Sequence, residues 1–171
     1  MAKLAIKDDC LAPEKYIYLN YSGPNPYEIV KKIAGSFNAF FHVSSSKVCE
    51  YDFRWDRMGD PIGFFNRWWV KKEYSKYTTA WFHFQVQGKQ AREGKEGEFR
   101  MEISSEIRTD VGSRNPLFML LWDIYSYSFY NRRRREYIRK CANMATSFRD
   151  EMKNHFNLQI SGERGEMARQ R

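Results

Sequence analysis

The chain has 171 residues, of which 42% are hydrophobic, 17% aromatic and 29% charged, and its formal net charge is +8. This composition excludes a disordered or fibrous protein and predicts one globular domain over residues 1–158, followed by a mobile basic tail at residues 159–171. Because no run of about 18 apolar residues occurs and the start lacks a long apolar segment, we expect neither a membrane span nor a signal peptide.

The first predicted strand lies within residues 14–23. Ile17, Leu19 and Tyr21 alternate there with side chains of the opposite face, which is the period of a strand. We expect this strand to end at Gly23, which starts a turn.

A helix is predicted directly after this strand. Asn25 is a suitable N-cap, Pro26 suits the first helical position, and Glu28 follows the cap at the capping-box distance. Gly35 marks a place where the helix either bends or divides. The apolar face of this helix consists of Ile29, Ile33, Phe37 and Phe40.

Four longer antiparallel strands are predicted next, at residues 47–56, 64–74, 78–88 and 98–111. The first, third and fourth show alternation between the side chains of two faces, so each of these has one buried and one solvated face. In the first of these strands, Cys49, Tyr51, Phe53 and Trp55 alternate with charged residues, which predicts an inward aromatic face.

A long C-terminal helix is predicted from Pro116 to about Phe156, with no internal glycine or proline. Such a helix spans about 60 Å, whereas strands of about ten residues cover about 33 Å. The helix therefore either projects beyond the sheet or breaks near Tyr130–Arg135. In both cases the arginines lie at the rim of the sheet, and the apolar stripe from Ile138 to Met152 needs separate cover from the first helix, a second copy or another protein.

The predicted fold is α+β: a curved antiparallel sheet of about five to six strands that grips a long C-terminal helix, with a short helix after the first strand. This element order resembles the START-like (SRPBCC, helix-grip) superfamily across nearly the whole chain. A cystatin-like sheet wrapped on one helix, with an appended C-terminal helix, is the competing topology.

The START-like resemblance implies non-catalytic binding of a hydrophobic small molecule between the sheet and the C-terminal helix. Ligand pockets are mostly apolar with a few polar anchors, and the arginines near the mouth suit an acidic head group. The alternative is that the same rings fill the interior completely. The residues expected to wall the pocket are Tyr51, Phe53, Trp55, Phe82, Phe84, Met101, Ile103, Leu121 and Tyr125.

The second hypothesis is binding to RNA or a ribonucleoprotein. From residue 113 onward the chain holds 12 Lys and Arg against 6 Asp and Glu, so most of the net positive charge belongs to the C-terminal helix. Arginines beside tyrosines suit RNA, because guanidinium groups hold phosphates while rings stack on bases. The expected contact residues are Arg132, Arg133, Arg134, Arg135, Arg139 and Lys140.

An enzyme is the least favoured reading, because GxSxG, P-loop, HExxH and GxGxxG motifs are absent. Only His83 and Glu102 are candidates for a general acid or base. Histidines and glutamates in such positions are more often surface residues without a catalytic role. We expect no catalytic residue, no cofactor and no metal. The three cysteines are far apart and form no CxxC or Cys/His cluster, so we also expect no disulfide and a cytoplasmic protein.

Overall fold

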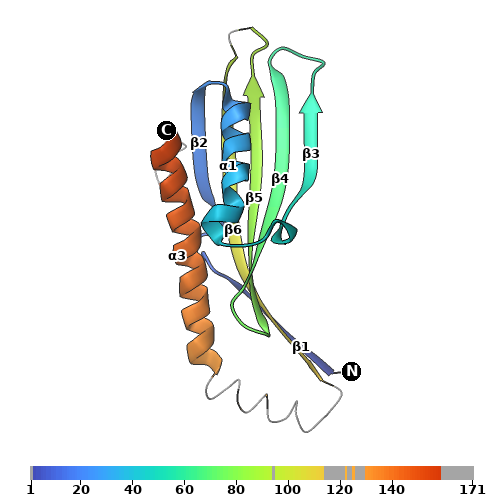
Figure 1. Ribbon diagram of the computed structural model, residues 1–171, viewed down its shortest axis with the longest axis vertical. Coiled ribbons are helices and arrows are strands. Elements are labelled where there is room, and N and C mark those ends of the chain that lie inside the picture. The colour runs from blue at the N-terminus through green and yellow to red at the C-terminus, as the bar shows by residue number, and fades with distance from the viewer. Residues whose placement is uncertain (1, 94, 114–121, 123–124, 126–129, 159–171) are drawn as a thin grey trace, which may run out of the picture.

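The computed structural model describes residues 2–93, 95–113, 122, 125 and 130–158, and of residues 2–4, 112 and 113 only the backbone. Figure 1 shows the arrangement of the elements in this part of the chain. The elements are β1 Ala2–Asp9, β2 Ile17–Pro24, α1 Pro26–Phe41, the 3-10 turn η1 Ser45–Lys47, β3 Val48–Asp56, β4 Ile62–Glu73, β5 Thr78–Gln90, β6 Glu96–Ser113 and α3 Asn131–Phe156.

Within the described residues the strands form one six-stranded antiparallel sheet in the order β1-β6-β5-β4-β3, with β2 also paired to β6. Strand β6 is 18 residues long, so β2 pairs with its first half and β1 with its second half. This architecture confirms the predicted α+β fold with a curved antiparallel sheet. Strand β1 was not predicted, because the start of the chain is too short and too polar to show clear alternation.

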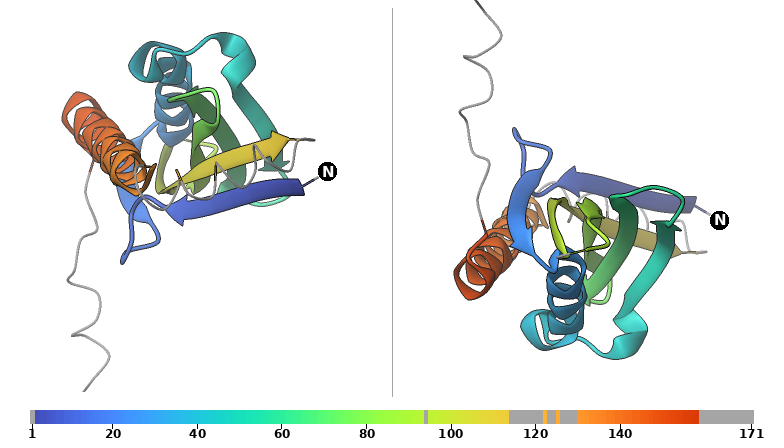
Figure 2. Two further views of the ribbon diagram at one scale, coloured as in Figure 1. Left: turned by 90° about the horizontal axis from the view of Figure 1, so that it is seen from below. Right: turned by 90° about the horizontal axis from the view of Figure 1, so that it is seen from above.

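Both helices lie on the inner face of the curved sheet (Figure 2). Every second residue of β4, β5 and β6 points into the core there, as the alternation predicted for β5 and β6. Large side chains from α1, from α3 and from the sheet fill this core. They are Phe37 and Phe41 of α1, Phe148 of α3, and Phe82, Phe84, Met101, Ile103 and Ile107 of the sheet.

The predicted inward face of β3 is wrong for Cys49 and Tyr51 and correct for Phe53 and Trp55. A β-bulge between Glu50 and Asp52 breaks the alternation, because one extra residue shifts every later side chain to the other face. Tyr51 is the extra residue and is 52% exposed, and Phe53 returns to the inner face but is still 51% exposed. The strand lies at the open edge of the sheet (Figure 1), where α1 reaches it through Tyr27, whose ring centroid is 4.4 Å from that of Trp55.

Helix α1 begins at Pro26, as predicted, and is one continuous helix through Gly35. The predicted side-chain cap is absent: Asn25 has φ of 51° and makes no capping hydrogen bond through its side chain. Its backbone N–H instead donates to the carbonyl of Lys95 at 2.8 Å, which joins the start of α1 to the β5–β6 turn. Asparagine tolerates this left-handed conformation better than most residues.

Helix α3 has 26 residues and is therefore about 39 Å long, whereas β6 spans about 60 Å. The expected strand length of about ten residues is wrong for β6, and the full length of the predicted helix lies partly outside the described residues. Of the predicted helix before residue 130, Trp122 and Tyr125 are helical; the rest, with Leu121, lies outside the described residues. The apolar stripe from Ile138 to Met152 is buried at Cys141, Ala145, Phe148 and Met152. Helix α1 contributes to the cover of this stripe.

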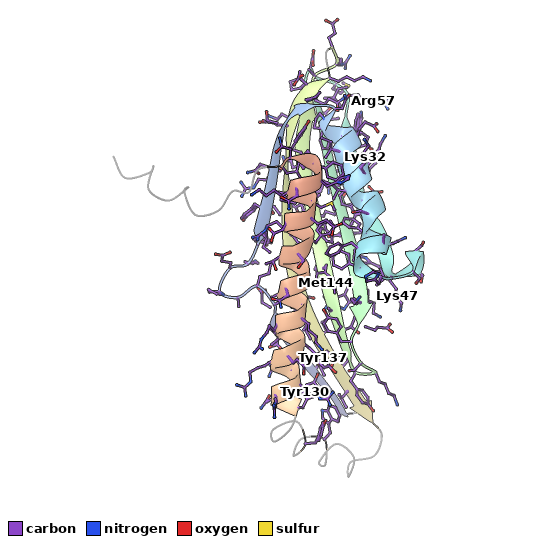
Figure 3. All side chains as sticks on the ribbon, turned by 60° about the vertical axis from the view of Figure 1, so that its left-hand side comes forward. Lys32, Lys47, Arg57, Tyr130, Tyr137 and Met144 are labelled. Carbon is purple, nitrogen blue, oxygen red and sulfur yellow. A yellow bond between two sulfur atoms is a disulfide. The ribbon has the colours of Figure 1, made fainter. Side chains whose placement is uncertain are left out.

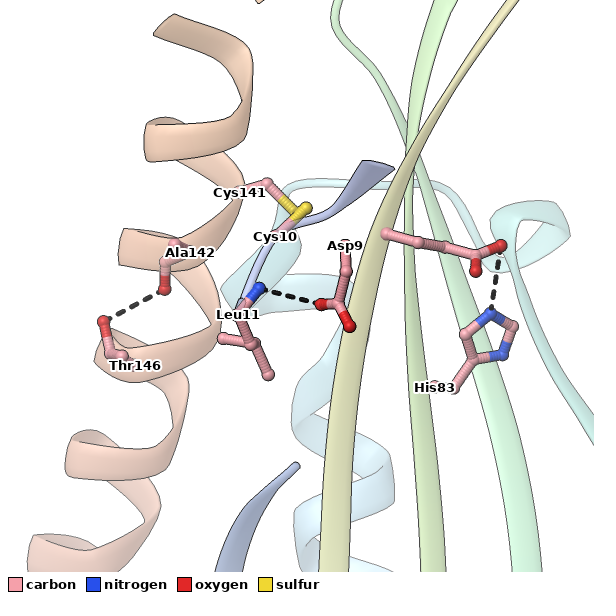
Figure 4. Close-up of a disulfide and its surroundings, with 8 residues drawn as sticks. Asp9, Cys10, Leu11, His83, Cys141, Ala142 and Thr146 are labelled. Atoms are coloured by element: carbon pink, nitrogen blue, oxygen red, sulfur yellow. Dashed lines mark hydrogen bonds and ion pairs between the residues drawn. A yellow bond between two sulfur atoms is a disulfide. The ribbon is translucent and has the colours of Figure 1, made fainter. Parts of the chain in front are cut away.

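A disulfide joins Cys10, just after β1, to Cys141 of α3, with their Cα atoms 5.9 Å apart (Figure 4). The expectation of no disulfide is therefore wrong. The two residues are 131 positions apart, and no sequence spacing announces such a pairing. Both half-cystines are buried, so the bond attaches the middle of α3 to the edge of the sheet. The cytoplasmic location, which rested partly on reduced cysteines, stays a prediction.

Candidate functional site

The N-terminal half of α3 carries a group of exposed cations that we call the basic surface: Arg132, Arg133, Arg135, Arg139 and Lys140. Because successive helical residues point about 100° apart, positions 132, 135 and 139 lie along one side of the helix. Three of the four consecutive arginines are thus exposed, whereas the sequence predicted all four at the rim of the sheet within reach of water.

The fourth arginine, Arg134, points toward the sheet instead. Its Nε donates to Oδ2 of Asp8 on β1 at 2.6 Å, and its second guanidinium nitrogen donates to Oδ1 of the same carboxylate. This bidentate pair raises the pKa of Arg134, chiefly through the hydrogen bonding to Asp8. The first turn of α3 is therefore attached to β1, and this attachment leaves the neighbouring arginines on the solvent side.

A buried hydroxyl cluster anchors the beginning of α3. The hydroxyl of Tyr130 lies 2.5 Å from Oγ1 of Thr78 and 2.7 Å from Oγ1 of Thr109, and these threonines belong to β5 and β6. Two turns further, Tyr137 stacks on Tyr74 with ring centroids 5.6 Å apart. Two of the tyrosines expected to stack on RNA bases are thus engaged within the protein.

One carboxylate, Glu136, lies among the five cations. Oε1 of Glu136 is 2.8 Å from Nζ of Lys140 one turn later, and the hydrogen bond from this lysine lowers the pKa of Glu136. Even with this pair counted, the surface keeps a charge of +4. Arginine guanidinium groups bind phosphate and carboxylate oxygens through two parallel hydrogen bonds, so this surface suits a polyanion.

Four of the nine residues predicted to wall a ligand pocket belong to the packed core. Phe82, Phe84, Met101 and Ile103 are each at most 1% exposed. The rings of α1 lie directly on them; the Phe37 and Phe84 centroids, for example, are 4.4 Å apart and stacked. These four side chains are not brought together with the remaining candidates, because Trp55, Phe53 and Tyr51 lie at the open β3 edge and Tyr125, 44% exposed, lies before α3.

No protein-family model matches the chain, and no curated protein matches it. A solved structure, that of the protein of unknown function SA2116 from Staphylococcus aureus, aligns over 91% of this chain and 95% of its own with 7% sequence identity. The TM-score is 0.28, which is too low to define a shared fold. The START-like resemblance stays a prediction.

The outer face of the sheet holds a polar hollow of about 470 Å³ over β2, β5 and β6. Its lining contains two cations, Lys89 and Arg100, and two carboxylates, Glu98 and Glu102, so it has no net charge. Arg100 also lies over the ring of Tyr18, with its guanidinium carbon 4.1 Å from the ring centroid. Outward charges of opposite sign face one another across the strands, as Lys89 and Glu98 do.

His83 lies on this outer face, with Nε2 3.9 Å from Oε1 of Glu106 (Figure 4). Burial lowers the pKa of His83, and the nearby charges of Arg108 and Lys7 lower it further against the opposing effect of Glu106. Burial also disfavours the charged form of Glu106, but hydrogen bonds from Lys7 and Arg108 outweigh it and lower its pKa. The carboxylate is therefore paired with cations.

We expect stability to fall as the pH drops below about 6.5, the ordinary histidine value, through the lowered pKa of folded His83. Between the folded and the unfolded pKa of His83, the unfolded chain binds a proton at this residue and the folded protein does not. Urea melts of the wild type and His83→Gln between pH 5 and 7.5 test this, and the variant should show the smaller decline. His155→Gln, at an exposed histidine, is the matched control; identical declines in the wild type and His83→Gln would contradict the assignment.

Sequence reasoning missed the residues that position the basic surface. Asp8, Cys10, Thr78 and Thr109 reach α3 from strands far away in the sequence. Nothing in their local pattern signals these contacts. Tyr27, which lies beside Trp55 at the β3 edge, was also missed, although an aromatic residue in the first turn of a helix is a recognisable signal. Among the described residues, no group of three or more His, Cys, Asp or Glu side chains forms a metal site.

Proposed function

We propose that this protein is a non-catalytic RNA-binding protein that uses the basic surface of α3. The observation that carries the proposal is the exposure of five cations within nine consecutive residues, with a single carboxylate among them. Among the residues that the structure describes, no helix is long and apolar enough to cross a membrane. A strongly basic helix surface on a globular body is the electrostatic footprint of nucleic-acid binding.

The basic surface is positioned rigidly, which favours binding. The Arg134–Asp8 pair, the Tyr130 hydroxyl cluster and the Cys10–Cys141 disulfide all attach this half of α3 to the sheet. Arg132 and Arg139 are about 10 Å apart along the helix axis, so the row of guanidinium groups can contact several phosphates of one strand. A fixed cationic row loses less conformational entropy on binding than a mobile one.

The contacts are expected to be with phosphates and not with bases. Tyr130 is buried and Tyr137 is stacked on Tyr74, so their rings are not available for base stacking. Phosphate contacts give affinity and salt dependence without reading the sequence. We therefore propose sequence-independent binding of single-stranded RNA.

The test is fluorescence anisotropy with labelled 20-nucleotide polyuridine RNA at several salt concentrations. We expect Arg132→Gln/Arg133→Gln/Arg135→Gln to weaken binding at least tenfold at low salt. If three phosphate contacts are lost, the slope of log affinity against log salt becomes shallower by about 2, since each contact contributes about 0.7 for single strands.

The matched control is Lys32→Gln/Lys95→Gln/Lys153→Gln, which removes the same charge from exposed positions outside the basic surface. This variant should keep most of the affinity and the salt slope. Equal losses in both triple variants would contradict a defined site, because only net charge would then matter. Binding to phosphatidylserine vesicles without binding to RNA would also overturn the proposal.

Binding of a hydrophobic molecule between sheet and C-terminal helix remains a prediction. What opposes it is the packing of α1 rings on the residues expected to line such a cavity, including Phe82 and Phe84. An aromatic groove elsewhere in the fold, between α1 and the edge strand β3, offers a different place for a small molecule.

A further inference from the structure

A groove of about 440 Å³ lies between the first turns of α1 and the edge strand β3. Helix α1 packs over β4 and β5 and leaves the inner face of β3 uncovered. The volume falls within the range of small-molecule sites. The lining residues are Tyr27, Lys31, Phe53, Trp55 and Arg57.

The walls of this groove are aromatic. The edge of Tyr27 meets Trp55 with ring centroids 4.4 Å apart, and Phe53 lies 6.3 Å from Trp55 at an interplanar angle of 33°. Phe64 stacks beneath Trp55 and lies flat over Gly88, where a Cβ would come within 2.2 Å of the ring. The half-exposed face of Phe53 therefore has no protein ring to cover it, which suits a flat aromatic ligand.

The charge at the groove is positive. The Nζ of Lys31 lies 4.6 Å from the ring centroid of Tyr27, and the exposed side chain of Arg57 lines the same groove. Lys31 also forms an ion pair with Glu28 at 3.0 Å. Because this pair is exposed on the helix surface, it contributes little to stability and readily gives way to contacts with water. Two cations at one aromatic groove suit a ligand with an acidic substituent.

Polar atoms around the groove lack partners. The indole Nε1 of Trp55, a lining residue, is buried without a hydrogen-bond acceptor. Asn66 lies opposite Phe53 on the same face, is only 3% exposed, donates to Glu50 at 2.6 Å and leaves its own Oδ1 unpartnered. Buried polar groups are normally satisfied, so these two atoms mark the β3 edge as a place where the hydrogen bonding of the described residues is incomplete.

We propose that the α1–β3 groove binds a small aromatic anion, such as an aromatic carboxylate, whose ring packs against the exposed side of Phe53 and Trp55 and whose acidic group faces Lys31 and Arg57. This site is separate from the basic surface, since Arg57 and Tyr130 lie at opposite ends of the molecule (Figure 3). Ligand binding in the groove therefore does not depend on RNA binding by the basic surface, and the failure of one would leave the other unaffected.

The test is a fluorescence titration with 1-anilinonaphthalene-8-sulfonate, a planar aromatic anion. We expect saturable binding to the wild type and at least fivefold weaker binding to Phe53→Ala. Tyr51→Ala is the matched control, because Tyr51 is equally exposed on the same strand but does not line the groove. It should bind as the wild type does. Equal effects of the two substitutions, or no saturable binding, would overturn the site.

A second arm tests the charge. N-phenyl-1-naphthylamine has the same ring system without the sulfonate, so Lys31→Gln/Arg57→Gln should weaken the sulfonate by fivefold or more and leave the neutral probe unchanged. In addition, the indole N–H resonance of Trp55, assigned by Trp55→Phe, should shift when the sulfonate binds. Equal weakening of both probes would contradict an anion-specific groove, and polyuridine RNA affinity should be the same in all groove variants.

Discussion

Reduction of the Cys10–Cys141 disulfide is expected to lower the free energy of unfolding by about 3–5 kcal/mol. The bond closes a loop with a sequence separation of 131 residues, and the chain-entropy relation gives about 5 kcal/mol for a loop of that length. Measured values are commonly smaller because the reduced unfolded chain retains some structure. For a chain of this size the loss corresponds to a fall in Tm of about 10 °C.

Guanidinium melts in the presence and absence of a phosphine reductant measure this effect, and Cys10→Ala/Cys141→Ala should match the reduced wild type. Cys49→Ala is the control, because Cys49 is the free cysteine of the described chain and lies on the outer face of β3. Superimposable melts of oxidised and reduced wild-type protein would show that the bond does not constrain the unfolded chain.

Replacement of Phe148 by alanine is expected to cost about 3–5 kcal/mol, the usual range for a large aromatic residue in a packed core. Phe148 is 0% exposed. Its ring centroid lies 5.6 Å from that of Phe37, 5.4 Å from that of Phe41 and 5.2 Å from that of Phe84. This one side chain therefore joins α3, α1 and the sheet, and its removal leaves a cavity among rigid rings that cannot collapse.

Denaturant melts measure this loss, with Phe156→Ala as the control because Phe156 lies on the same helix but is only partly buried. The control should cost about 1–2 kcal/mol. If Phe148→Ala were no more destabilising than Phe156→Ala, the packing between the two helices and the sheet would be looser than the ring distances indicate.

The two stability predictions bear on the proposed function because they concern the attachment of α3. The disulfide and Phe148 fix the middle of the helix, while Arg134 and Tyr130 fix its beginning. The exposed arginines lie between these attachments and do not take part in them. Substitutions in the basic surface should therefore change RNA affinity without changing the fold. A loss of affinity in the binding test can then be assigned to the lost arginines and not to unfolding.

The alternation of apolar and polar residues by itself determined the faces of β5 and β6. Phe82, Phe84, Met101 and Ile103 all point into the core as predicted, because the side-chain period of a strand is a local property. The sequence also placed all four arginines at the rim of the sheet within reach of water, and Arg132, Arg133 and Arg135 are exposed as expected. The start of α1 at Pro26 is likewise a local signal.

Tertiary structure alone decided which charges and rings are used. The bulge at Tyr51 leaves no trace in the alternating pattern, yet it places Phe53 and Trp55 beside Tyr27. Arg134 is distinguished from its neighbours only because Asp8, 126 positions away, lies opposite it. The pairing of Cys10 with Cys141 is of the same kind. Contacts between residues so far apart depend on how the whole chain closes, and local periodicity carries no information about that closure.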